Sequence, residues 1–588
     1  MMSRINSAFK RVVAFLVQPI ENELPFLLSF FLLISLSPIK FLVAGILFPE
    51  QMDPVVFIHL SRAMAISYLL TCAVYYTRAT WLKVVFYAIG CTLFSVNLFV
   101  WLVFHRAFSP QLFVLVGETN YREATEFITT FLLRGRGLFC LLIIAVMIGA
   151  IAFAERKKWP LTQPHRWLVV SSYVILVCSL FGLCHFNVYY EIYKSKNYED
   201  LNVGNRFPYD NVTATVLALY DVRAIAHEMR SAIRLAKNEK GGQIIGNDSL
   251  HVVLVIGESY IKSHAQVYGY YLPTTPCMMQ EKENGRLFAF NNVIAPFKQT
   301  SDVMKNLMCC NSIAEGENWY QSVYFPTCFK KSGFVVNYWD NQRNSSNLGG
   351  WDFSMDSFLF DKELCKISYD MSATEAFEYD DQLISDFEHS GKKKAGKYVF
   401  DIFHLWGQHV DAANRYPHDK FSRFSAKDIH TRAAYMNGAK RQDVANYDNA
   451  TYYNDAVMGH IFRLYRNGNA VVVYISDHGE EVYDYRDSKG RVEAAPGQEK
   501  NYLKYQFEVP FIIWCSEKYK TLHPDVIRRI KASLNRPFMT DNLCHVLFDL
   551  AGLKTIYYRP DRDLISPRFK PTKRLVNYTV DYDAVMRQ

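Results

Sequence analysis

The sequence is poor in the features that identify several common classes of protein. None of its 12 cysteines forms a CxxC pair, so a zinc–cysteine centre is not expected. A formal net charge of only +8 over 588 residues gives no indication of a nucleic-acid partner. Internal repeats and low-complexity tracts are also missing, which argues against a repeat architecture.

The cysteines fall into two groups that follow the hydropathy of the chain. Five of them, including Cys72 and Cys184, lie in apolar runs and are expected to be small buried residues. The other seven lie after residue 190, in a part of ordinary globular composition. If that part is exported, disulfides can form among them, and the sequence leaves their pairing open.

Long apolar runs, in contrast, dominate the first third of the chain. Their length and number exclude buried core helices, so the sequence predicts a five-span helical transmembrane domain over residues 1–190. No small-residue cleavage site follows the first run, which is therefore expected to be a retained anchor. The predicted spans are residues 25–48, 55–76, 81–104, 137–154 and 167–186.

The distribution of basic residues predicts the orientation of these spans. Basic residues precede the first span and follow the second and fourth, whereas the loop at residues 49–54 has none. The positive-inside rule then places the N-terminus in the cytoplasm and everything after the fifth span outside. The basic residues concerned are Arg4, Lys10, Arg11, Arg78, Lys83, Arg156, Lys157, Lys158 and Arg166.

Two polar segments adjoin the predicted membrane spans. The outward loop at residues 117–127, GETNYREATEF, carries Thr119 and Glu123, and an interfacial helix with an N-terminal cap is its simplest interpretation. Residues 191–248 are predicted to be a linker, with a basic amphipathic helix at residues 213–237. That helix is expected either on the bilayer surface or packed against the following domain.

Strand-like runs alternate with helical patterns over residues 249–588. This alternation predicts an α/β domain with a mostly parallel sheet and helices on both faces. The runs are HVVLVIGES, GFVVNYWDNQ, KYVFDIFHLWGQH, AVVVYISDHGE and FEVPFIIW.

Three of these runs end in ionisable residues, namely Glu258, the pair His404 and His409, and the pair Asp477 and His478. Because the carboxyl ends of parallel strands meet at one edge of a sheet, several such endings predict a common site. Neighbouring Asp and His side chains suit a metal such as zinc. The alternative is that Asp477 caps the next element and His478 lies on the surface.

Thr300 is the candidate nucleophile for this site. It stands just before a helical pattern, where unpaired backbone amides and the helix dipole favour a bound anion such as phosphate. A threonine hydroxyl becomes a competent nucleophile when a metal lowers its pKa. The alternative is that Thr300 serves as the helix N-cap.

Four segments of the chain resemble the signatures of the membrane-bound phosphoethanolamine transferases, within the alkaline phosphatase/sulfatase superfamily. The resemblance implies five spans followed by an exported, periplasmic α/β/α domain of the alkaline-phosphatase/sulfatase type, anchored in a bacterial inner membrane. The segments are GESYIKSHAQVYGYYLPTTP, HLWGQHVDAANRYP, SDHGEEV and ETNYREATEF.

The resemblance implies a role for each candidate residue. Glu258, Asp477 and His478 would bind a catalytic Zn²⁺, with Thr300 as fourth ligand and nucleophile. His409, and less directly His404, would contact the phosphoryl group or the acceptor, and Asn341 matches a substrate-contacting position loosely. Thr119 and Glu123 would help to hold the lipid substrate.

The reaction implied by the resemblance is a two-step transfer. Thr300 would take phosphoethanolamine from phosphatidylethanolamine and pass it to lipopolysaccharide, at lipid A or a core sugar, or to another envelope glycan. The enzyme is expected to be a monomer in contact with membrane lipids.

The sequence departs from the family pattern at two functional positions. Leu272 stands where the family has Arg, and no further His follows the Asp-His pair; the corresponding region, residues 483–507, offers Lys500, Lys504 and Tyr505. Around Thr300, QTSDVMKNLM is closer to the branch that modifies core sugars than to the lipid A enzymes. The acceptor and the second phosphate-contacting group therefore stay open.

Three alternative functions are compatible with parts of the pattern. A glycerolphosphate transferase of the lipoteichoic acid synthase type shares the five-span plan and a nucleophile segment like FKQTSD, but GYYLPTTP and GQHVDAANRYP fit the phosphoethanolamine group better. A sulfatase would need a Cys/Ser-x-Pro-x-Arg segment, which is not found. A non-catalytic, membrane-anchored binding domain would be expected to have lost Glu258, Thr300, Asp477 or His478, and all four are present.

Overall fold

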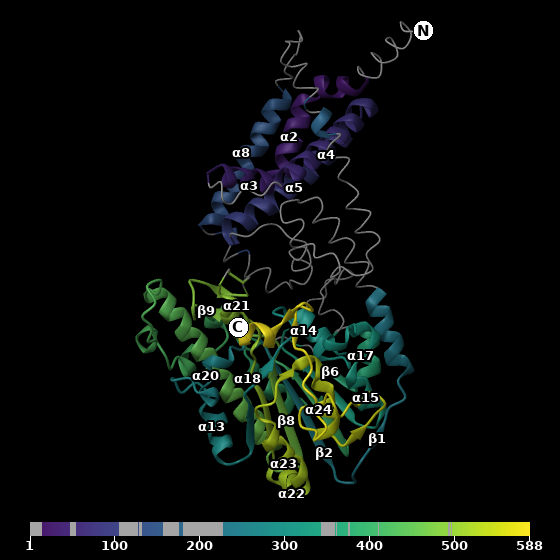
Figure 1. The fold of residues 1–588 in the computed structure, drawn as a ribbon, viewed down its shortest axis with the longest axis vertical. Coiled ribbons are helices and arrows are strands. Elements are labelled where there is room, and N and C mark those ends of the chain that lie inside the picture. Colours follow the sequence, from purple (N-terminus) through teal and green to yellow (C-terminus); the bar gives the residue numbers. More distant parts are fainter. Residues whose placement is uncertain are drawn as a thin grey trace. The chain divides into compact units, whose positions relative to one another are not determined.

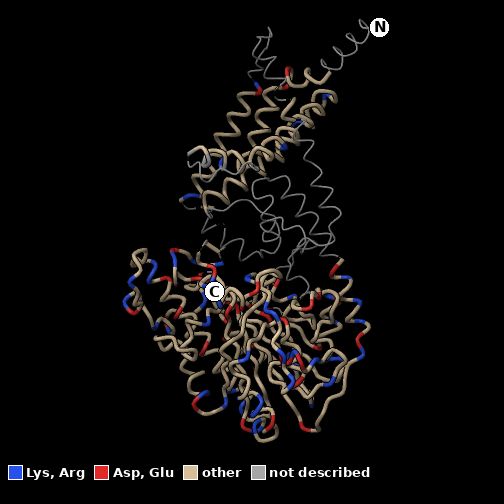
Figure 2. Tube along the Cα trace, viewed as in Figure 1, with Lys and Arg blue, Asp and Glu red and all other residues tan. Residues whose placement is uncertain are grey.

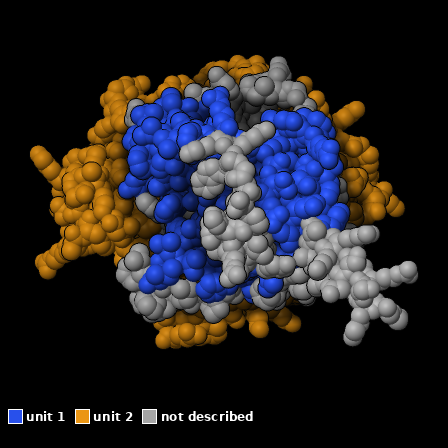
Figure 3. All heavy atoms as spheres, turned by 90° about the horizontal axis from the view of Figure 1, so that it is seen from above, with its two compact units in different colours: residues 1–224 blue, residues 225–588 orange. Residues whose placement is uncertain are grey.

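The computed structural model forms two compact units, residues 1–224 and 225–588 (Figures 1 and 3). The predicted three-part division, with its linker at residues 191–248, stays a prediction. The residues described are 15–47, 55–104, 128, 132–133, 135–156, 174, 176–179, 227–342, 359, 361–373, 375, 377–409, 411–491, 494–495 and 497–588.

The first unit is a packed group of apolar helices on which charged residues are sparse (Figure 2). Its described helices include the one at residues 15–22, α2 (Leu24–Ile34), α3 (Leu36–Leu47), α4 (Val55–Thr77), α5 (Thr80–Phe104) and α8 (Arg136–Arg156). Among the described residues, α4, α5 and α8 are long and apolar enough to cross a membrane, and they coincide with the second, third and fourth predicted spans. Counting the pair of helices at residues 15–22 and 24–34, bent by 81°, as one span gives four.

One lysine connects three helices of this unit. Lys83 on α5 donates to Glu23 Oε2 (2.7 Å), just before α2, and to Glu155 Oε2 (2.6 Å) on α8. Tyr87 also donates to Glu155 Oε1 (2.7 Å), so both carboxylate oxygens of that residue are paired. The network holds α2, α5 and α8 together through charge as well as apolar packing.

The predicted first span is not one continuous helix. Its described part, residues 25–47, instead falls in α2 and α3, with an interruption at Ser35. Pro38 explains the break, because it has no N–H to donate to the Ile34 carbonyl and its ring crowds that carbonyl. The predicted fifth span, residues 167–186, lies almost entirely outside the described residues and stays a prediction, as do Thr119 and Glu123 in the outward loop.

The second unit is built on a seven-stranded sheet in the order β3-β11-β8-β2-β7-β5-β6. β11 is antiparallel to both of its neighbours, β3 and β8, and the remaining pairs are parallel. The predicted, mostly parallel sheet is confirmed. The strands are β2 (Leu250–Gly257), β3 (Leu287–Phe290), β5 (Val335–Asp340), β6 (Met371–Ala373), β7 (Tyr398–His404), β8 (Ala470–Ser476) and β11 (Phe511–Cys515).

Helices cover both faces of this sheet, which gives the predicted α/β/α arrangement (Figure 1). On β2, Val252 and Leu254 belong to one apolar core and Val253 and Val255 to the other. Strands buried on both faces read as continuous apolar runs, which is why the sequence revealed them. One core includes α14 (Thr300–Leu307), α15 (Phe325–Lys331), α17 (Lys362–Ser368), α21 (Glu499–Phe507), α22 (Glu517–Leu522), α23 (Pro524–Ser533), α24 (Leu543–Leu550) and α25 (Tyr582–Arg587), and the other α13 (Pro276–Glu283), α18 (Asp380–His389) and α20 (Gly438–Tyr465).

Short elements complete the unit. The hairpin of β9 (Glu481–Val482) and β10 (Lys489–Gly490) follows β8 and returns the chain toward the end of that strand. The others are α19 (His418–Phe421), β1 (Gln243–Ile244), β4 (Val293–Ile294), β12 (Phe538–Met539), β13 (Leu553–Lys554), β14 (Leu575–Val576) and β15 (Val580–Asp581).

A helix at residues 227–238, which includes the described part of the predicted amphipathic helix, packs against this unit. Ala232 and Ala236 are buried in the apolar core that contains α14, and Met229 and Ile233 pack beside them. Of the two predicted positions of this helix, the structure therefore shows packing against the following domain.

Candidate active site

The three strands whose endings carry ionisable residues are neighbours in the middle of the sheet. β2 lies between β8 and β7, and all three are parallel. Glu258 follows β2 directly, and Asp477 and His478 follow β8 directly. All three side chains are fully buried. The predicted convergence at the carboxyl edge of the sheet is thus present.

The loop after β7 lies tightly against Glu258. Gly407 has φ +56°, and a Cβ built there would meet the Glu258 backbone nitrogen at 2.7 Å. Gln408 N–H donates to the Glu258 carbonyl at 3.0 Å. Only glycine fits both the left-handed backbone and this close approach. The backbone therefore explains why the GQH segment begins with glycine.

Hydrogen bonds fix the orientation of Asp477 and His478. Ser259 N–H donates to Asp477 Oδ1 at 3.0 Å. His478 Nδ1 lies 2.7 Å from the Gly479 carbonyl, so Nδ1 carries a proton and Nε2 is the ring nitrogen that faces the site. The alternatives considered for these two residues, a helix cap and a surface histidine, are wrong.

Thr300 is the first residue of α14 and lies next to Glu258 and His478. Gln299 occupies the N-cap position, so the alternative role of Thr300 as N-cap is wrong. Thr300 Oγ1 is instead 3.1 Å from Glu258 Oε2 and 3.3 Å from His478 Nε2. The hydroxyl is therefore positioned by side chains from two strands and by the N-terminus of a helix.

The donor set suits a divalent metal ion. One ligand atom each from Glu258, Asp477 and His478 lies within 4.8 Å of the others. Asp477 Oδ2 is buried and receives no hydrogen bond from the described residues, so one carboxylate oxygen is left for a cation. Two carboxylates, an imidazole nitrogen and a hydroxyl are oxygen and nitrogen donors that zinc accepts in a four-coordinate site.

The pKa values of the clustered carboxylates also favour a bound metal ion. Burial and the neighbouring Glu258 carboxylate raise the pKa of Asp477 to about 7. Burial opposes ionisation of Glu258 too, but the charge of His478 lowers the pKa of Glu258 well below its ordinary value. Two adjacent buried carboxylates disfavour each other's charge, and a cation between them relieves that repulsion.

His409 lies close to the cluster. Its ring packs edge-on against Trp406, with ring centroids 5.9 Å apart. Burial lowers the pKa of His409 to about 3, although the charge of Glu258 acts in the opposite direction. A neutral imidazole at this position can accept or donate a hydrogen bond, and its predicted contact with substrate stays a prediction.

His404 and Asn341 are buried, and each is hydrogen-bonded to other protein groups. His404 Nδ1 is 2.6 Å from Asp340 Oδ2. Asn341 donates to Asp380 Oδ1 (2.8 Å) and accepts from Phe377 N–H (2.7 Å). Asp380 in turn accepts from Trp406 N–H (2.8 Å), at the start of the loop that carries His409. The predicted substrate contacts of His404 and Asn341 stay predictions, and this geometry favours supporting roles.

Two residues at the site were not found from the sequence. Gln342 donates to Glu258 Oε2 (3.2 Å) and to the Leu405 carbonyl (2.9 Å), tying the ends of β2 and β7 together. Arg491 Nη1 lies 3.4 Å from Thr300 Oγ1 and 3.3 Å from His478 Nε2. For the region after the Asp-His pair, the sequence offered Lys500, Lys504 and Tyr505, and no spacing rule pointed to Arg491.

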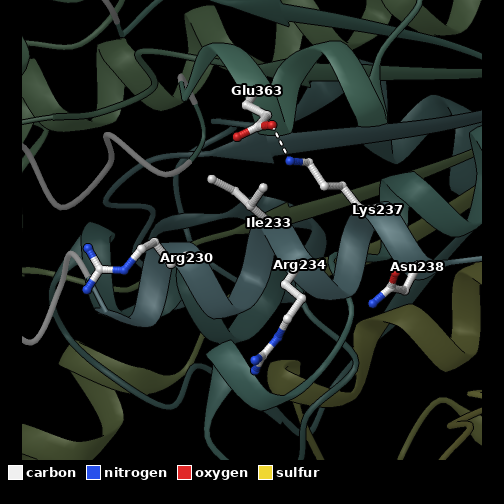
Figure 4. A pocket seen from close by; sticks show the side chains of 6 residues that line it. All are labelled: Arg230, Ile233, Arg234, Lys237, Asn238 and Glu363. Atoms are coloured by element: carbon white, nitrogen blue, oxygen red, sulfur yellow. Dashed lines mark ion pairs between the residues drawn. The ribbon is translucent and has the colours of Figure 1, made fainter.

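A separate cavity of about 290 Å³ lies beside residues 227–238 (Figure 4). It is basic, although Lys237 is paired with Glu363 across it. It shares no residue with the cluster around Thr300, so it is not part of the candidate active site. Its lining is Arg230, Ile233, Arg234, Lys237, Asn238 and Glu363.

A comparison with protein families defines the class of this chain. Residues 251–553, more than half of the 588-residue chain, match the model of the family described as Sulfatase. The chain therefore belongs to the sulfatase family.

Within that class, the similarity extends along most of the chain to phosphoethanolamine transferases. The chain is 26% identical over 527 residues to phosphoethanolamine transferase EptC of Escherichia coli O18:K1:H7, covering 86% of this chain and 87% of that relative. It is 27% identical over 530 residues to phosphoethanolamine transferase CptA of Salmonella typhimurium, with the same coverage of 86% and 87%. The resemblance drawn from the sequence motifs is confirmed.

Solved structures support the fold. The integral membrane lipooligosaccharide phosphoethanolamine transferase A from Neisseria meningitidis matches with a TM-score of 0.56 over 94% of this chain and 98% of its own, at 16% identity. The C-terminal periplasmic domain of EptC from Escherichia coli matches with a TM-score of 0.50 over 57% of this chain and 94% of its own, at 28% identity. A helical membrane domain followed by a sulfatase-like α/β domain is thus the architecture of this chain.

Proposed function

We propose that this protein is a zinc-dependent phosphoethanolamine transferase of the bacterial inner membrane. Its donor is phosphatidylethanolamine, and its acceptor is lipopolysaccharide, at lipid A or a core sugar, or another envelope glycan. The observation that carries the proposal is the position of Thr300, whose hydroxyl lies within 3.3 Å of two residues of a buried metal-ligand cluster at a helix N-terminus. The relatives that share 86% of the chain bear this activity in their names.

The residues present suit the chemistry of the transfer. A zinc ion bound by Glu258, Asp477 and His478 would lower the pKa of the Thr300 hydroxyl and polarise a phosphoryl oxygen. The N-terminal amides of α14 stabilise negative charge on the same phosphoryl group. His409, whose lowered pKa of about 3 keeps it neutral at physiological pH, is proposed to hydrogen-bond the donor or acceptor.

The two steps balance in atoms and protons. In the first, Thr300 Oγ1 forms a bond to phosphorus, the bond from phosphorus to the glycerol oxygen breaks, and diacylglycerol leaves with the proton that Thr300 gave up. In the second, an acceptor hydroxyl or phosphate oxygen attacks the phosphorus, the bond to Thr300 breaks, and Thr300 recovers a proton from the acceptor. Phosphoethanolamine thus passes from one lipid-anchored molecule to another.

The arrangement in the membrane is part of the proposal. From the basic loops we infer that the N-terminus lies in the cytoplasm and the sulfatase-like unit in the periplasm. Thr119 and Glu123 in the outward loop are proposed to hold the lipid substrate. The protein is proposed to act as a monomer, because a single chain carries every residue of the site.

The test is to detect the covalent intermediate. We expect the purified full-length protein, incubated with zinc and phosphatidylethanolamine, to gain the mass of one phosphoethanolamine group, mapped to Thr300 by peptide sequencing. Thr300→Ala is expected to show no adduct, because it removes the oxygen that forms the bond to phosphorus.

A matched control and an alternative donor make the result decisive. Ser301→Ala changes the neighbouring hydroxyl and is expected to leave the adduct intact. A glycerophosphate adduct formed from phosphatidylglycerol, with none from phosphatidylethanolamine, would instead identify a glycerolphosphate transferase. An adduct from neither lipid would contradict both transferase functions.

A further inference from the structure

We propose that Arg491 binds the non-bridging oxygens of the phosphoryl group transferred by Thr300. The proposal rests on the function proposed above and adds a residue that no sequence motif indicated. It would fill the position for which the region after the Asp-His pair offers no histidine.

The position of Arg491 is suited to this contact. Its Nη1 lies 3.4 Å from the nucleophile oxygen and 3.3 Å from His478 Nε2, so the guanidinium borders the point at which phosphorus would be attacked. A guanidinium presents parallel N–H groups that match two oxygens of a phosphoryl group. Arg491 is partly exposed, in contrast to the fully buried Glu258, Asp477 and His478.

The charge of the site creates the need for such a group. Glu258, Asp477 and an ionised Thr300 carry three negative charges, which exceed the two positive charges of a zinc ion by one. A phosphodiester donor brings one more negative charge to the same place. Attack by an anion on an anion is slow unless cationic donors offset the repulsion. Arg491 supplies that positive charge next to the nucleophile.

The hairpin that presents Arg491 is firmly held on both sides. Arg486 forms two hydrogen bonds of 2.7 Å to Glu481, across the turn of the hairpin. Gln506 Nε2 donates to the carbonyl of Gly490, the residue before Arg491, at 3.0 Å. Asp484, between the two strands, lies 2.8 Å from His264 Nε2. Arg491 is therefore positioned before substrate binds, which is what efficient stabilisation of a transition state requires.

The experiment compares Arg491→Ala and Arg491→Lys with the wild-type full-length protein loaded with zinc. We expect Arg491→Ala to slow formation of the Thr300 adduct from phosphatidylethanolamine by about 10²–10³-fold, the usual cost of losing one transition-state donor. The rate of adduct formation in Arg491→Lys is expected to lie between those of wild type and Arg491→Ala. The lysine ammonium keeps the positive charge but lacks the paired N–H groups of the guanidinium. Lys489→Ala removes a charge two residues away on the same hairpin and is expected to behave like wild type.

Two measurements separate substrate binding from other roles. Calorimetry with inorganic phosphate is expected to show at least a tenfold loss of affinity in Arg491→Ala. Zinc content by elemental mass spectrometry is expected to stay unchanged. Loss of zinc in parallel with the rate would overturn the proposal, since Arg491 would then act on the metal centre.

Other outcomes are equally informative. Rates and phosphate affinity in Arg491→Ala equal to those of Lys489→Ala would overturn the proposal. If Arg491→Ala fails to fold, Arg491→Lys carries the test, and a wild-type rate and affinity in that variant would overturn it. A wild-type protein that forms no adduct contradicts the proposed function, whereas the phosphate measurement still decides the role of Arg491.

Discussion

His264 shows how one ionised side chain supports the active site from a distance. Its Nδ1 lies 2.6 Å from Asp448 on α20, and its Nε2 lies 2.8 Å from Asp484 on the hairpin that carries Arg491. Burial opposes protonation of the ring, but the two carboxylates raise the pKa of His264 to about 10. The imidazolium therefore fixes the hairpin to α20 throughout the physiological pH range.

We predict that His264→Ala destabilises the second unit by roughly 3–5 kcal/mol, the usual cost of removing one partner from a buried ion pair. Because the folded pKa of about 10 exceeds the ordinary value of 6.5, the stabilisation is complete below about pH 6.5 and is lost as the pH rises through 10. Denaturant unfolding between pH 6 and pH 10 should show the gap between wild type and variant closing.

His389→Ala, which changes an exposed histidine at the end of α18, is the matched control. It should follow the wild-type curve at every pH. A gap for His264→Ala that stays constant to pH 10 would show that the ring is not held in its protonated form.

Single residues also explain what the sequence could and could not predict about the site. Glu258, Asp477 and His478 were predictable because each directly follows a strand whose apolar run is unmistakable. Arg491 was not, because its position depends on a short hairpin whose strands have two residues each and no periodicity to read. Asn341 directly follows β5 and His404 ends β7, yet their side chains turn to Asp380 and Asp340, and only packing decides that direction.

At the scale of elements, the loop after β7 depends on one glycine. We predict that Gly407→Ala displaces Glu258, because the new Cβ would stand 2.7 Å from the Glu258 nitrogen at a φ of +56°. The strain should cost about 1–3 kcal/mol of stability. Because the shifted residue is a proposed ligand, zinc affinity measured by competition with a chelator should fall about 10–100-fold.

Gly438→Ala is the control for this substitution. Gly438 begins α20, and a Cβ there would meet nothing within 4 Å, so alanine should be neutral or slightly stabilising. Equal zinc affinities for the two alanine variants would mean that the loop can move away from Glu258 at no cost.

Elements were predictable in proportion to their length and burial. Five strands of five to eight residues were identified from their apolar runs, whereas β3 and β6, with four and three residues, were missed. The break between α2 and α3 was missed because hydropathy does not register the lost hydrogen bond at Pro38. Packing of residues 227–238 on the sheet core was one of two predicted outcomes, since an amphipathic face fits either a bilayer or a protein surface.

At the scale of the whole molecule, the two units carry separable tasks. We predict that residues 225–588, produced alone, fold cooperatively and bind zinc, because the sheet, both apolar cores and the metal-ligand cluster all lie within them. The same fragment should transfer phosphoethanolamine from lipid vesicles far more slowly than the full chain, because it lacks the membrane helices.

Calorimetric unfolding, zinc titration and transfer from vesicles, each measured on fragment and full chain, check this prediction. A fragment that matches the full chain in vesicle transfer would show that the membrane unit serves only as an anchor. A fragment that does not bind zinc would contradict the independence of the second unit.

The dispersed origin of the proposed metal ligands has a consequence for the order of events in the cell. Ser259, next to Glu258, bonds to Asp477 across 218 residues of chain, and Thr300 comes from a third segment. Because the chain is synthesised from its N-terminus, Glu258 and Thr300 are made long before β8. If the proposed function holds, metal binding is expected to be one of the last events in maturation, and Thr300 of a half-made chain could not yet react with lipids.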